Sequence, residues 1–333
     1  MKVWYEPCVF SDHDLAVATV KINEIKQGPG NWKMNSSTIE SDLFNKCFCS
    51  FWEDWKTKKG NFTSLGMWWD VGKIKIKELT IWCSKKLKQD NSRYQILLEN
   101  RIKSLKDQEN FDHDLLSRSE QLLKSHLISV NEGNRIRSKV QWFEEGEQST
   151  KFFHGIEKSK AKNKSFENIL DKKGELKSGT DEIMKVQVEF YKDLYSSEGI
   201  DVSARNFFGQ YITKTLSSED LNIMNKNLDL EELTKAIGKM KKDKSPGPDG
   251  ITPAFYKKFW NIIKHDLLDV FESCYVSEEL TYSQYLALLV LLYKKGQRED
   301  IKNWRPISLS NTDVKILTKA FAECLRIVLP KFD

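Results

Sequence analysis

The sequence predicts an α+β fold in which helices dominate. Between Pro29 and Pro246 the 333-residue chain contains no proline, and this stretch is rich in Lys, Glu, Leu and Gln, which favour helices. Strand-like segments lie mainly towards the two ends. Val, Ala and Thr alternate in LAVATVKI at 15–22, and the segment YLALLVLLY at 285–293 is predicted to be a buried strand.

Composition indicates a folded protein rather than a disordered one, because 39% of the residues are hydrophobic and 30% are charged. The longest apolar run, Leu286–Leu292, has seven residues, well short of the roughly 18 that a membrane helix needs. We therefore expect no membrane partner. Six scattered cysteines form no zinc-type pairs, so we expect reduced thiols and an intracellular protein.

Positive charge is concentrated in one region of the chain. The formal net charge is only +5, but residues 235–264 carry eight lysines and two aspartates. Lysines beside aromatic residues are typical of proteins that bind the phosphate backbone of nucleic acids. A solvated charged face explains the same pattern, and composition does not decide between the two.

The N-terminal half is expected to contain a strand region followed by helices. Ser11-Asp12-His13 precedes the alternating strand. The loop-forming segment GPGNWKMN at 28–35 then marks the end of this first region. Leucines and isoleucines recur at helical spacing through 36–165. Within this region Glu132-Gly133-Asn134 is predicted to be the turn between two helical arms.

A short hairpin is predicted next. In FENILDKKGELKS, at 166–178, the pair Lys173-Gly174 separates two short strand-like runs. Helices are expected to follow at 181–195 and 217–227.

Two helices flank a rigid turn, PGPDG at 246–250. Asp229 begins a capping box, and the helix that it starts, 229–242, must end before Pro246 because a residue that precedes proline resists the α conformation. The second helix, 252–275, starts at Thr252 and Pro253. Helical spacing assigns its apolar stripe to the core. The turn is predicted to hold one basic surface made of Lys241, Lys242, Lys244, Lys257 and Lys258.

A second hairpin is predicted from a strand at 285–296, a polar loop and a strand at 305–309. It would bring Lys294, Lys295 and Arg305 near one another, and a final helix capped by Asn311 would follow. Fixed cations on a stiff element can grip a triphosphate, and arginine suits a bidentate grip. Ordinary surface charge is the alternative that the charge pattern leaves open.

Several stretches resemble a known family. SPGPDGITPAFYKKFW at 245–260, followed by LLVLLYKKGQREDIKNWRPISLSNTDVKILTKAFAECL at 288–325, resembles the opening motifs of LINE-type (non-LTR) retrotransposon reverse transcriptases. The order and spacing of these motifs both fit. The segment 137–176 is similar to the region that such proteins carry between endonuclease and polymerase. FSDHDLAVATVKI with GPGNWKMN is similar to the end of their apurinic-type endonuclease.

The resemblance implies a domain order. Residues 1–35 would be the C-terminal tail of an endonuclease sandwich, and 36–165 a helical linker. Residues 166–228 would be an N-terminal extension of the reverse transcriptase, and 229–333 a part of the fingers of a right-hand polymerase, including the β-hairpin. We expect an internal segment of a longer protein, with the palm after Asp333 and the endonuclease metal ligands before Met1.

The resemblance also implies roles for individual residues. Lys294 and Arg305 match the residues of the fingers that hold the triphosphate of the incoming nucleotide, and the lysines around 241–258 would lie near the template RNA. Asp12 and His13 match an endonuclease pair in which the histidine acts at the scissile phosphate and the aspartate orients it. The parent enzyme uses Mg²⁺, and we expect no specific metal site in this chain.

The chain also departs from the family. Palm aspartates, including an adjacent pair, hold the two metal ions of such a polymerase, but this sequence contains no adjacent aspartates. Tyr293 stands where the family often has proline. Whether the chain is an enzyme is therefore left open, and we expect no polymerase activity from the chain alone.

Two main hypotheses result. The chain is part of a protein that copies RNA into DNA at a nicked target, with RNA, DNA and deoxynucleoside triphosphates as partners in the cytoplasm and nucleus. Alternatively, it is a non-catalytic nucleic-acid-binding protein derived from such an element. A helical scaffold without a nucleic-acid role is a third interpretation.

Overall fold

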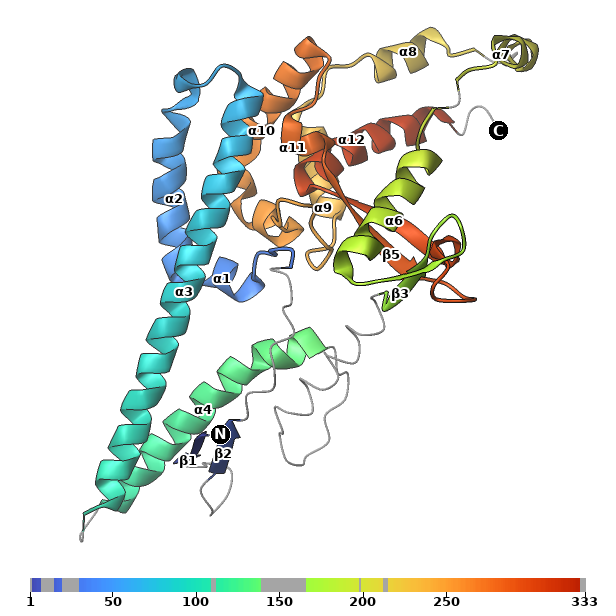
Figure 1. Ribbon diagram of the computed structural model, residues 1–333. Coiled ribbons are helices and arrows are strands. Elements are labelled where there is room, and N and C mark those ends of the chain that lie inside the picture. The colour runs from blue at the N-terminus through green and yellow to red at the C-terminus, as the bar shows by residue number, and fades with distance from the viewer. Residues whose placement is uncertain are drawn as a thin grey trace. The chain divides into compact units, whose positions relative to one another are not determined.

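The computed structural model describes residues 2–6, 15–19, 30–108, 112–138, 166–197, 199–211 and 215–329 (Figure 1). Helices dominate and the described strands form short antiparallel hairpins, in agreement with the predicted α+β class. No helix in these ranges is both long enough and apolar enough to cross a membrane.

The chain divides into two compact units. The first unit contains residues 1–31, 35–47 and 78–163, and the second contains 32–34, 48–77 and 164–333. Helices α2 (Asp42–Lys56) and α3 (Leu65–Lys106) each contribute residues to both units. The four predicted domains, with boundaries after residues 35, 165 and 228, stay a prediction.

The first unit contains a strand hairpin and two long helical segments. Strands β1 (Lys2–Glu6) and β2 (Leu15–Thr19) pair antiparallel. The short helix α1 (Ser36–Glu40) is capped by the side chain of Asn35, which accepts a hydrogen bond from the backbone N–H of Ser37.

Leucine and isoleucine residues at helical spacing pack α3 against α4 (His113–Ser138) in a helical hairpin, but its position differs from the predicted one. Leu98 and Ile102 of α3 pack on Leu123 of α4. The predicted turn at Glu132-Gly133-Asn134 is wrong, because α4 continues through these residues to Ser138. A glycine inside a helix costs only about 1 kcal/mol relative to alanine, and a helix of 26 residues can absorb that cost.

The core of the second unit is aromatic. Helix α10 (Pro253–Ser277) buries Phe255 and Phe259, as their spacing predicts, and both rings contact Phe48 at centroid distances of 5.0 and 4.3 Å. The indole of Trp52 donates a hydrogen bond to Asp266 at 2.9 Å. Three further helices of this unit are α8 (Ser218–Met224), α9 (Leu230–Lys239) and α12 (Thr312–Val328). Helices α9, α10 and α12 lie against one another (Figure 1).

Helix α9 starts at the predicted capping box, in which Asp229 and Glu232 bond to each other's backbone N–H groups. It ends at Lys239, three residues before the predicted end, because Met240 adopts an extended conformation with φ −76° and ψ 141°. The lysines that follow therefore lie in a loop rather than on the helix.

A β-hairpin projects from the helical core of this unit. The 3-10 helix at Ile301–Asn303 precedes its second strand, and α11 (Tyr282–Tyr285) precedes its first. Strands β5 (Ala287–Tyr293) and β6 (Trp304–Ser310) pair antiparallel, which confirms the predicted hairpin. The prediction that the first strand is buried is wrong, because each residue of β5 is half-buried or exposed, and the strand is shorter than the predicted 285–296.

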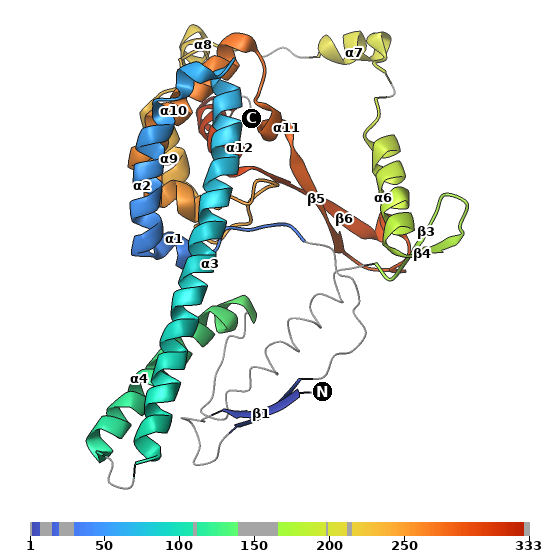
Figure 2. The ribbon, with the colours of Figure 1, turned by 60° about the vertical axis from the view of Figure 1, so that its left-hand side comes forward.

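One face of this hairpin is covered. Strands β3 (Asn168–Leu170) and β4 (Leu176–Ser178) form the predicted short hairpin, with Gly174 at φ +79° in its turn. Together with α6 (Thr180–Leu194), they lie against β5 and β6 (Figure 2). Leu289 and Leu291 pack here, and the ring of Phe166 stacks on Trp304 at 4.1 Å.

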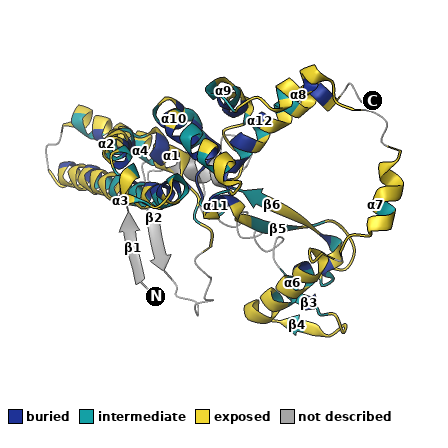
Figure 3. Cartoon of the chain, turned by 90° about the horizontal axis from the view of Figure 1, so that it is seen from above, coloured by how far each residue is buried: buried dark blue, intermediate teal, exposed yellow. Residues whose placement is uncertain are grey.

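Helix α7 (Val202–Gly209), which the sequence analysis did not predict, is almost entirely exposed (Figure 3). Asp201 caps it by accepting a hydrogen bond from the N–H of Ala204. This single local signal starts the helix, although the segment buries no residue.

Candidate nucleic-acid interface

The PGPDG turn packs closely on two other segments. Gly250 has φ +72°, a conformation that favours glycine, and a Cβ there would lie 2.3 Å from the carbonyl oxygen of Trp32. A Cβ on Gly247 would lie 2.5 Å from the backbone nitrogen of Asn311. Because backbone atoms of other segments approach so closely, only glycine fits at both positions. The turn therefore packs against these segments and does more than connect two helices.

The start of α12 holds the turn in place. The amide of Asn311 accepts a hydrogen bond from the N–H of Asp249 and donates one to the carbonyl of Ser283. The hydroxyl of Thr312 donates to the carbonyl of Ile251 at 2.7 Å. The predicted capping role of Asn311 is therefore wrong in its chemistry. Asn311 occupies the N-cap position, but its side chain binds these distant backbone groups instead of the helix.

A buried ion cluster lies beneath the turn. Lys73 of α3 is 3% exposed, and its Nζ lies 2.8 Å from Asp313, 3.6 Å from Asp249 and 3.8 Å from Asp70. The indole of Trp69 donates a second hydrogen bond to Asp313. The cluster thus joins α3, the PGPDG turn and α12 through charged groups that sit out of water.

Burial and mutual attraction determine the pKa values in this cluster. Burial opposes the charge on Lys73, but the carboxylates of Asp313 and Asp249 outweigh it and raise the pKa of the ammonium. Burial likewise opposes ionisation of Asp313, but Lys73 outweighs it and lowers the pKa of that carboxyl. For Asp249, the effect of burial is larger than the attraction of Lys73, so the pKa of the carboxyl is raised to about 6. Burial, together with the carboxylates, also raises the pKa of Tyr256.

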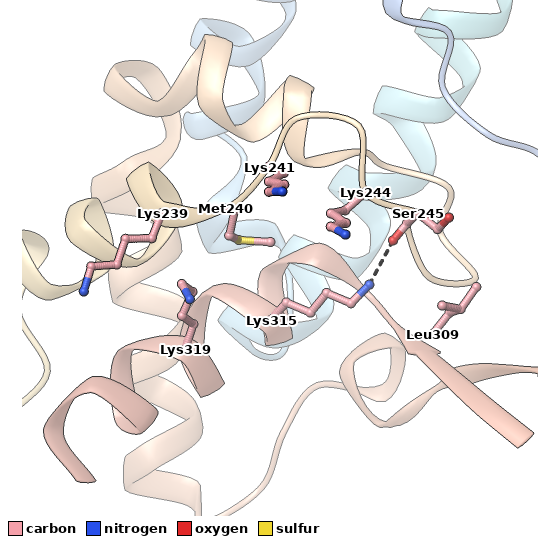
Figure 4. A pocket seen from close by; sticks show the side chains of 8 residues that line it. All are labelled: Lys239, Met240, Lys241, Lys244, Ser245, Leu309, Lys315 and Lys319. Carbon is pink, nitrogen blue, oxygen red and sulfur yellow. Dashed lines mark hydrogen bonds between the residues drawn. The ribbon is translucent and has the colours of Figure 1, made fainter. Parts of the chain in front are cut away.

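A hollow of about 570 Å³ lies between α12 and the loop that follows α9 (Figure 4). Five of the eight residues that line it are lysines, and we call it the lysine hollow. The five are Lys239, Lys241, Lys244, Lys315 and Lys319. Lys315 donates a hydrogen bond from Nζ to the carbonyl of Ser245 at 2.9 Å (Figure 4). Since Ser245 precedes Pro246, this bond fixes the loop at the point where the turn begins.

The structure brings together some of the predicted basic residues and separates others. Lys241 and Lys244 line the lysine hollow, and the exposed Lys242 between them does not. Lys257 instead donates from Nζ to the carbonyl of Gly238, near the end of α9, at 2.9 Å. The ammonium of Lys258 lies 5.8 Å from the centre of the Phe259 ring. The five predicted lysines therefore do not all line one hollow, and the role of each in binding stays a prediction.

The β5–β6 hairpin places Lys294 and Arg305 on the same face. Arg305 lies opposite Leu292, and the ladder extends through a bond from the N–H of Lys294 to the carbonyl of Asn303. Side chains alternate along a strand, so Lys294 projects on the face of Leu292 and Arg305, diagonally across from the arginine. Both cationic side chains are exposed, whereas the opposite face carries Trp304 and is covered.

Tyr293, at the position where the family often has proline, is the last residue of β5. Its hydroxyl donates to the carbonyl of Gly296 at 2.5 Å, and the guanidinium of Arg298 lies 4.8 Å from the centre of its ring. These contacts stay within the hairpin, so tyrosine helps to order the loop next to Lys294.

Asp12 and His13 lie outside the described residues. Among the residues that the structure does describe, no group of three His, Cys, Asp or Glu side chains is arranged to hold a metal ion. The three aspartates that do converge meet on the ammonium of Lys73. No chemical step below is assigned to a metal.

Comparison with known proteins extends over almost the whole chain. In an alignment of 329 residues that covers 96% of the chain, it is 31% identical to the uncharacterized 149 kDa protein of transposon TX1 from Xenopus laevis. Over 93 residues it is 29% identical to a retrovirus-related Pol polyprotein from the type-1 retrotransposable element R1 of Bradysia coprophila. The chain belongs to the proteins of LINE-type (non-LTR) retrotransposons.

This retrotransposon protein spans about a quarter of the TX1 protein, and its match to the R1 polyprotein covers 27% of the chain and 9% of the polyprotein. No family model matches the sequence.

Sequence reasoning missed the residues that organise the site in this retrotransposon protein. Lys73, Asp313, Lys315 and Lys319 were not singled out from the sequence. The spacing of Lys315 and Lys319 places both on one face of the last helix, and this was the available signal for two of the five lysines of the hollow. Nothing local marks Lys73, because its partner Asp313 is 240 residues away.

Proposed function

We propose that this chain forms part of a LINE-type reverse transcriptase and that its β5–β6 hairpin holds the triphosphate of the incoming deoxynucleotide. The observation that carries the proposal is the placement of Lys294 and Arg305 on one exposed face of the hairpin. Membership in the retrotransposon proteins supports the choice of ligand. The parent protein would copy RNA into DNA at a nicked target, and the second unit would supply part of the polymerase fingers.

The two cations suit different parts of a triphosphate. The planar guanidinium of Arg305 can bind two phosphate oxygens at once, whereas the ammonium of Lys294 acts as a compact charge with three donors. The hairpin is stiffened on its other face by Trp304, whose indole donates to the carbonyl of Arg298 at 2.7 Å. The charged groups are therefore presented by an element that needs little reorganisation when a nucleotide binds.

Nucleotide affinity tests this proposal directly. A fluorescent deoxynucleoside triphosphate is titrated with the whole chain, and Kd is read from anisotropy. A hydrogen bond to a charged group contributes about 1.5–3 kcal/mol, so Lys294→Ala and Arg305→Ala should each raise Kd by about tenfold or more.

Lys302→Ala is the matched control, since this exposed lysine lies in the 3-10 helix beside β6 and not on the proposed face. It should leave Kd within about twofold. If all three variants raised Kd equally, or if none of them changed Kd, the hairpin would not hold the triphosphate.

A non-catalytic nucleic-acid-binding protein is the second candidate. It is favoured by the eight lysines at 235–264. Salt-dependent binding of RNA, together with deoxynucleotide binding that is insensitive to Lys294 and Arg305, would support this candidate over the first.

A further inference from the structure

We propose that Asn303 and Trp304 are positioning residues for the triphosphate grip, because they lock the loop between β5 and β6 in one conformation before a nucleotide binds. The loop comprises residues 294–303, and we call it the hairpin loop. This positioning role rests on the proposed function, since Lys294, the first residue of the loop, is the side chain that is positioned. Neither Asn303 nor Trp304 is expected to touch the nucleotide.

Four successive carbonyl groups of the hairpin loop, at 296–299, each accept a hydrogen bond from a different donor. Three of the donors are side chains of the hairpin, and the fourth is a backbone N–H of strand β3. In chain order the bonds run from the hydroxyl of Tyr293 to Gly296 at 2.5 Å, from the amide of Asn303 to Gln297 at 3.0 Å, from the indole of Trp304 to Arg298 at 2.7 Å and from the N–H of Leu170 to Glu299 at 2.8 Å. Surface loops are usually more mobile than the elements that they connect. This loop is ordered beyond what a connection between two strands requires.

Asn303 connects this network to Lys294 directly. Its backbone carbonyl accepts a hydrogen bond from the N–H of Lys294 at 2.9 Å, while its side chain donates to the carbonyl of Gln297. The same side chain lies against Gly296, which has φ +96° and where a Cβ would lie 2.7 Å from the amide nitrogen of Asn303. Asn303 therefore determines both where the backbone of Lys294 lies and how the chain turns after it.

Strand β3 braces the hairpin loop from the covered face. The ring of Phe166 stacks on Trp304, which is 3% exposed, at 4.1 Å. Ile169 of β3 and Ile301 of the 3-10 helix are buried in one cluster beside the hairpin (Figure 2). A segment distant in the sequence thus supports one side of the loop, while Lys294 is exposed on the other side.

A locked loop strengthens nucleotide binding for a thermodynamic reason. The apparent Kd equals the intrinsic Kd divided by the fraction of the chain in the binding-competent conformation. With that fraction close to one, no free energy is lost in ordering the loop when the ligand binds. Loosening the loop should therefore weaken the contribution of Lys294 without removing a group that touches the nucleotide. Arg305 lies in the strand ladder opposite Leu292, so its position does not depend on the loop.

The affinity of loop variants tests the positioning role. The whole chain is titrated with the fluorescent deoxynucleoside triphosphate that tests the grip. Asn303→Ala removes the donor to Gln297 and should raise Kd by about threefold to tenfold, as expected for the net value of one hydrogen bond. Gln297→Ala is the matched control, because this exposed residue contributes only its backbone carbonyl to the four bonds. It should leave Kd within about twofold. Thermal unfolding confirms that each variant is folded.

A double-mutant cycle separates positioning from general support of the hairpin. In the Lys294→Ala background, Asn303→Ala should raise Kd by less than about twofold, because the side chain that it positions is gone. In the Arg305→Ala background, Asn303→Ala should keep its full effect. Equal effects in the two backgrounds would mean that Asn303 supports the whole hairpin, and they would overturn the positioning role.

Hydrogen exchange supplies a second readout. The amides of Lys294 and Asn303 both donate hydrogen bonds within the loop, so they should exchange slowly in the free chain and change little when the nucleotide is added. Fast exchange that slows on addition of the nucleotide would reveal a loop that closes on its ligand, which contradicts a loop locked in advance.

The same titrations distinguish failure of the positioning role from failure of the grip. If Lys294→Ala raises Kd while Asn303→Ala leaves it unchanged, the triphosphate grip stands and only the positioning role is rejected. If Lys294→Ala itself leaves Kd unchanged, the proposed function is rejected, and the positioning role is rejected with it.

Discussion

At the scale of single residues, Lys73 joins three separate segments of the second unit. It is one ammonium among three aspartates, and two of them, Asp249 and Asp313, are as buried as it is or nearly so. A buried charge is tolerated when it is paired and hydrogen-bonded. Here the pairing has a structural consequence, since Asp249 belongs to the PGPDG turn and Asp313 to the first turn of α12.

We expect Lys73→Met to lower the free energy of unfolding by about 3–5 kcal/mol, because it leaves buried carboxylates without their cation. Urea unfolding followed by circular dichroism measures the change. Lys88→Met is the control, since Lys88 is an exposed residue of the same helix, and it should change stability by less than about 0.5 kcal/mol. Similar losses in both variants would mean that the cluster is not specifically stabilising.

Asp249 makes the stability depend on pH. Its pKa is raised from 3.8 to about 6, so the carboxyl contributes stability below pH 3.8 that is lost as the pH rises through 6. The Asp249→Asn variant carries a neutral amide at this position, which does not ionise between pH 5 and pH 7. Between pH 5 and pH 7 the unfolding free energy of the variant should therefore gain about 1 kcal/mol relative to wild type. Urea unfolding at the two pH values tests this, and parallel pH profiles of the two proteins would contradict it.

At the scale of elements, the PGPDG turn and α12 act as one unit. The turn carries glycine where another backbone approaches closely. The side chain of Asn311 bonds to Asp249 in the turn, and Thr312 bonds to Ile251 just after it. Asp313 is linked to Asp249 through the ammonium of Lys73. Lys315, one turn further along α12, holds Ser245. The rigid turn thus sets the position of the loop that carries Lys241 and Lys244, which gives a physical reason for so sharp a connection between two helices.

Gly247→Ala tests this tight packing. The added Cβ would lie 2.5 Å from backbone atoms of Ser310 and Asn311, which have to shift, so we expect a loss of about 1–3 kcal/mol. Gly238→Ala is the opposite control, because this glycine lies inside α9 with open space around it and without a positive φ. It should stabilise the protein by about 0.5–1 kcal/mol. Thermal unfolding of both variants measures the difference, and a neutral Gly247→Ala would refute the close approach.

At the scale of the whole molecule, contacts between distant parts of the chain define the second unit. Trp69 and Lys73 of α3 bond to Asp313, 244 and 240 residues away, and Trp52 bonds to Asp266, 214 residues away. Part of the segment predicted to be a linker therefore completes the core around α10 and α12. In this retrotransposon protein the residues at 48–77 are integral to the unit that carries both candidate binding sites.

The sequence by itself determined the family and most of the described helices and strands. Periodic apolar residues, the Asp229–Glu232 capping box and the Lys173-Gly174 turn are local signals, and each produced the predicted element because its cause lies within a few residues. The motifs around PGPDG and the β5–β6 hairpin identified the retrotransposon family for the same reason, since order and spacing along the chain carry that information.

Only the tertiary structure decided how the charged residues are grouped. It ended α9 at Lys239, separated Lys242 and Lys257 from the lysine hollow, and added Lys315 and Lys319 from a helix more than 70 residues away. It also paired Lys73 with Asp313 across 240 residues. Spacing along the chain cannot specify such groupings, because they depend on which faces of distant helices the aromatic core brings together.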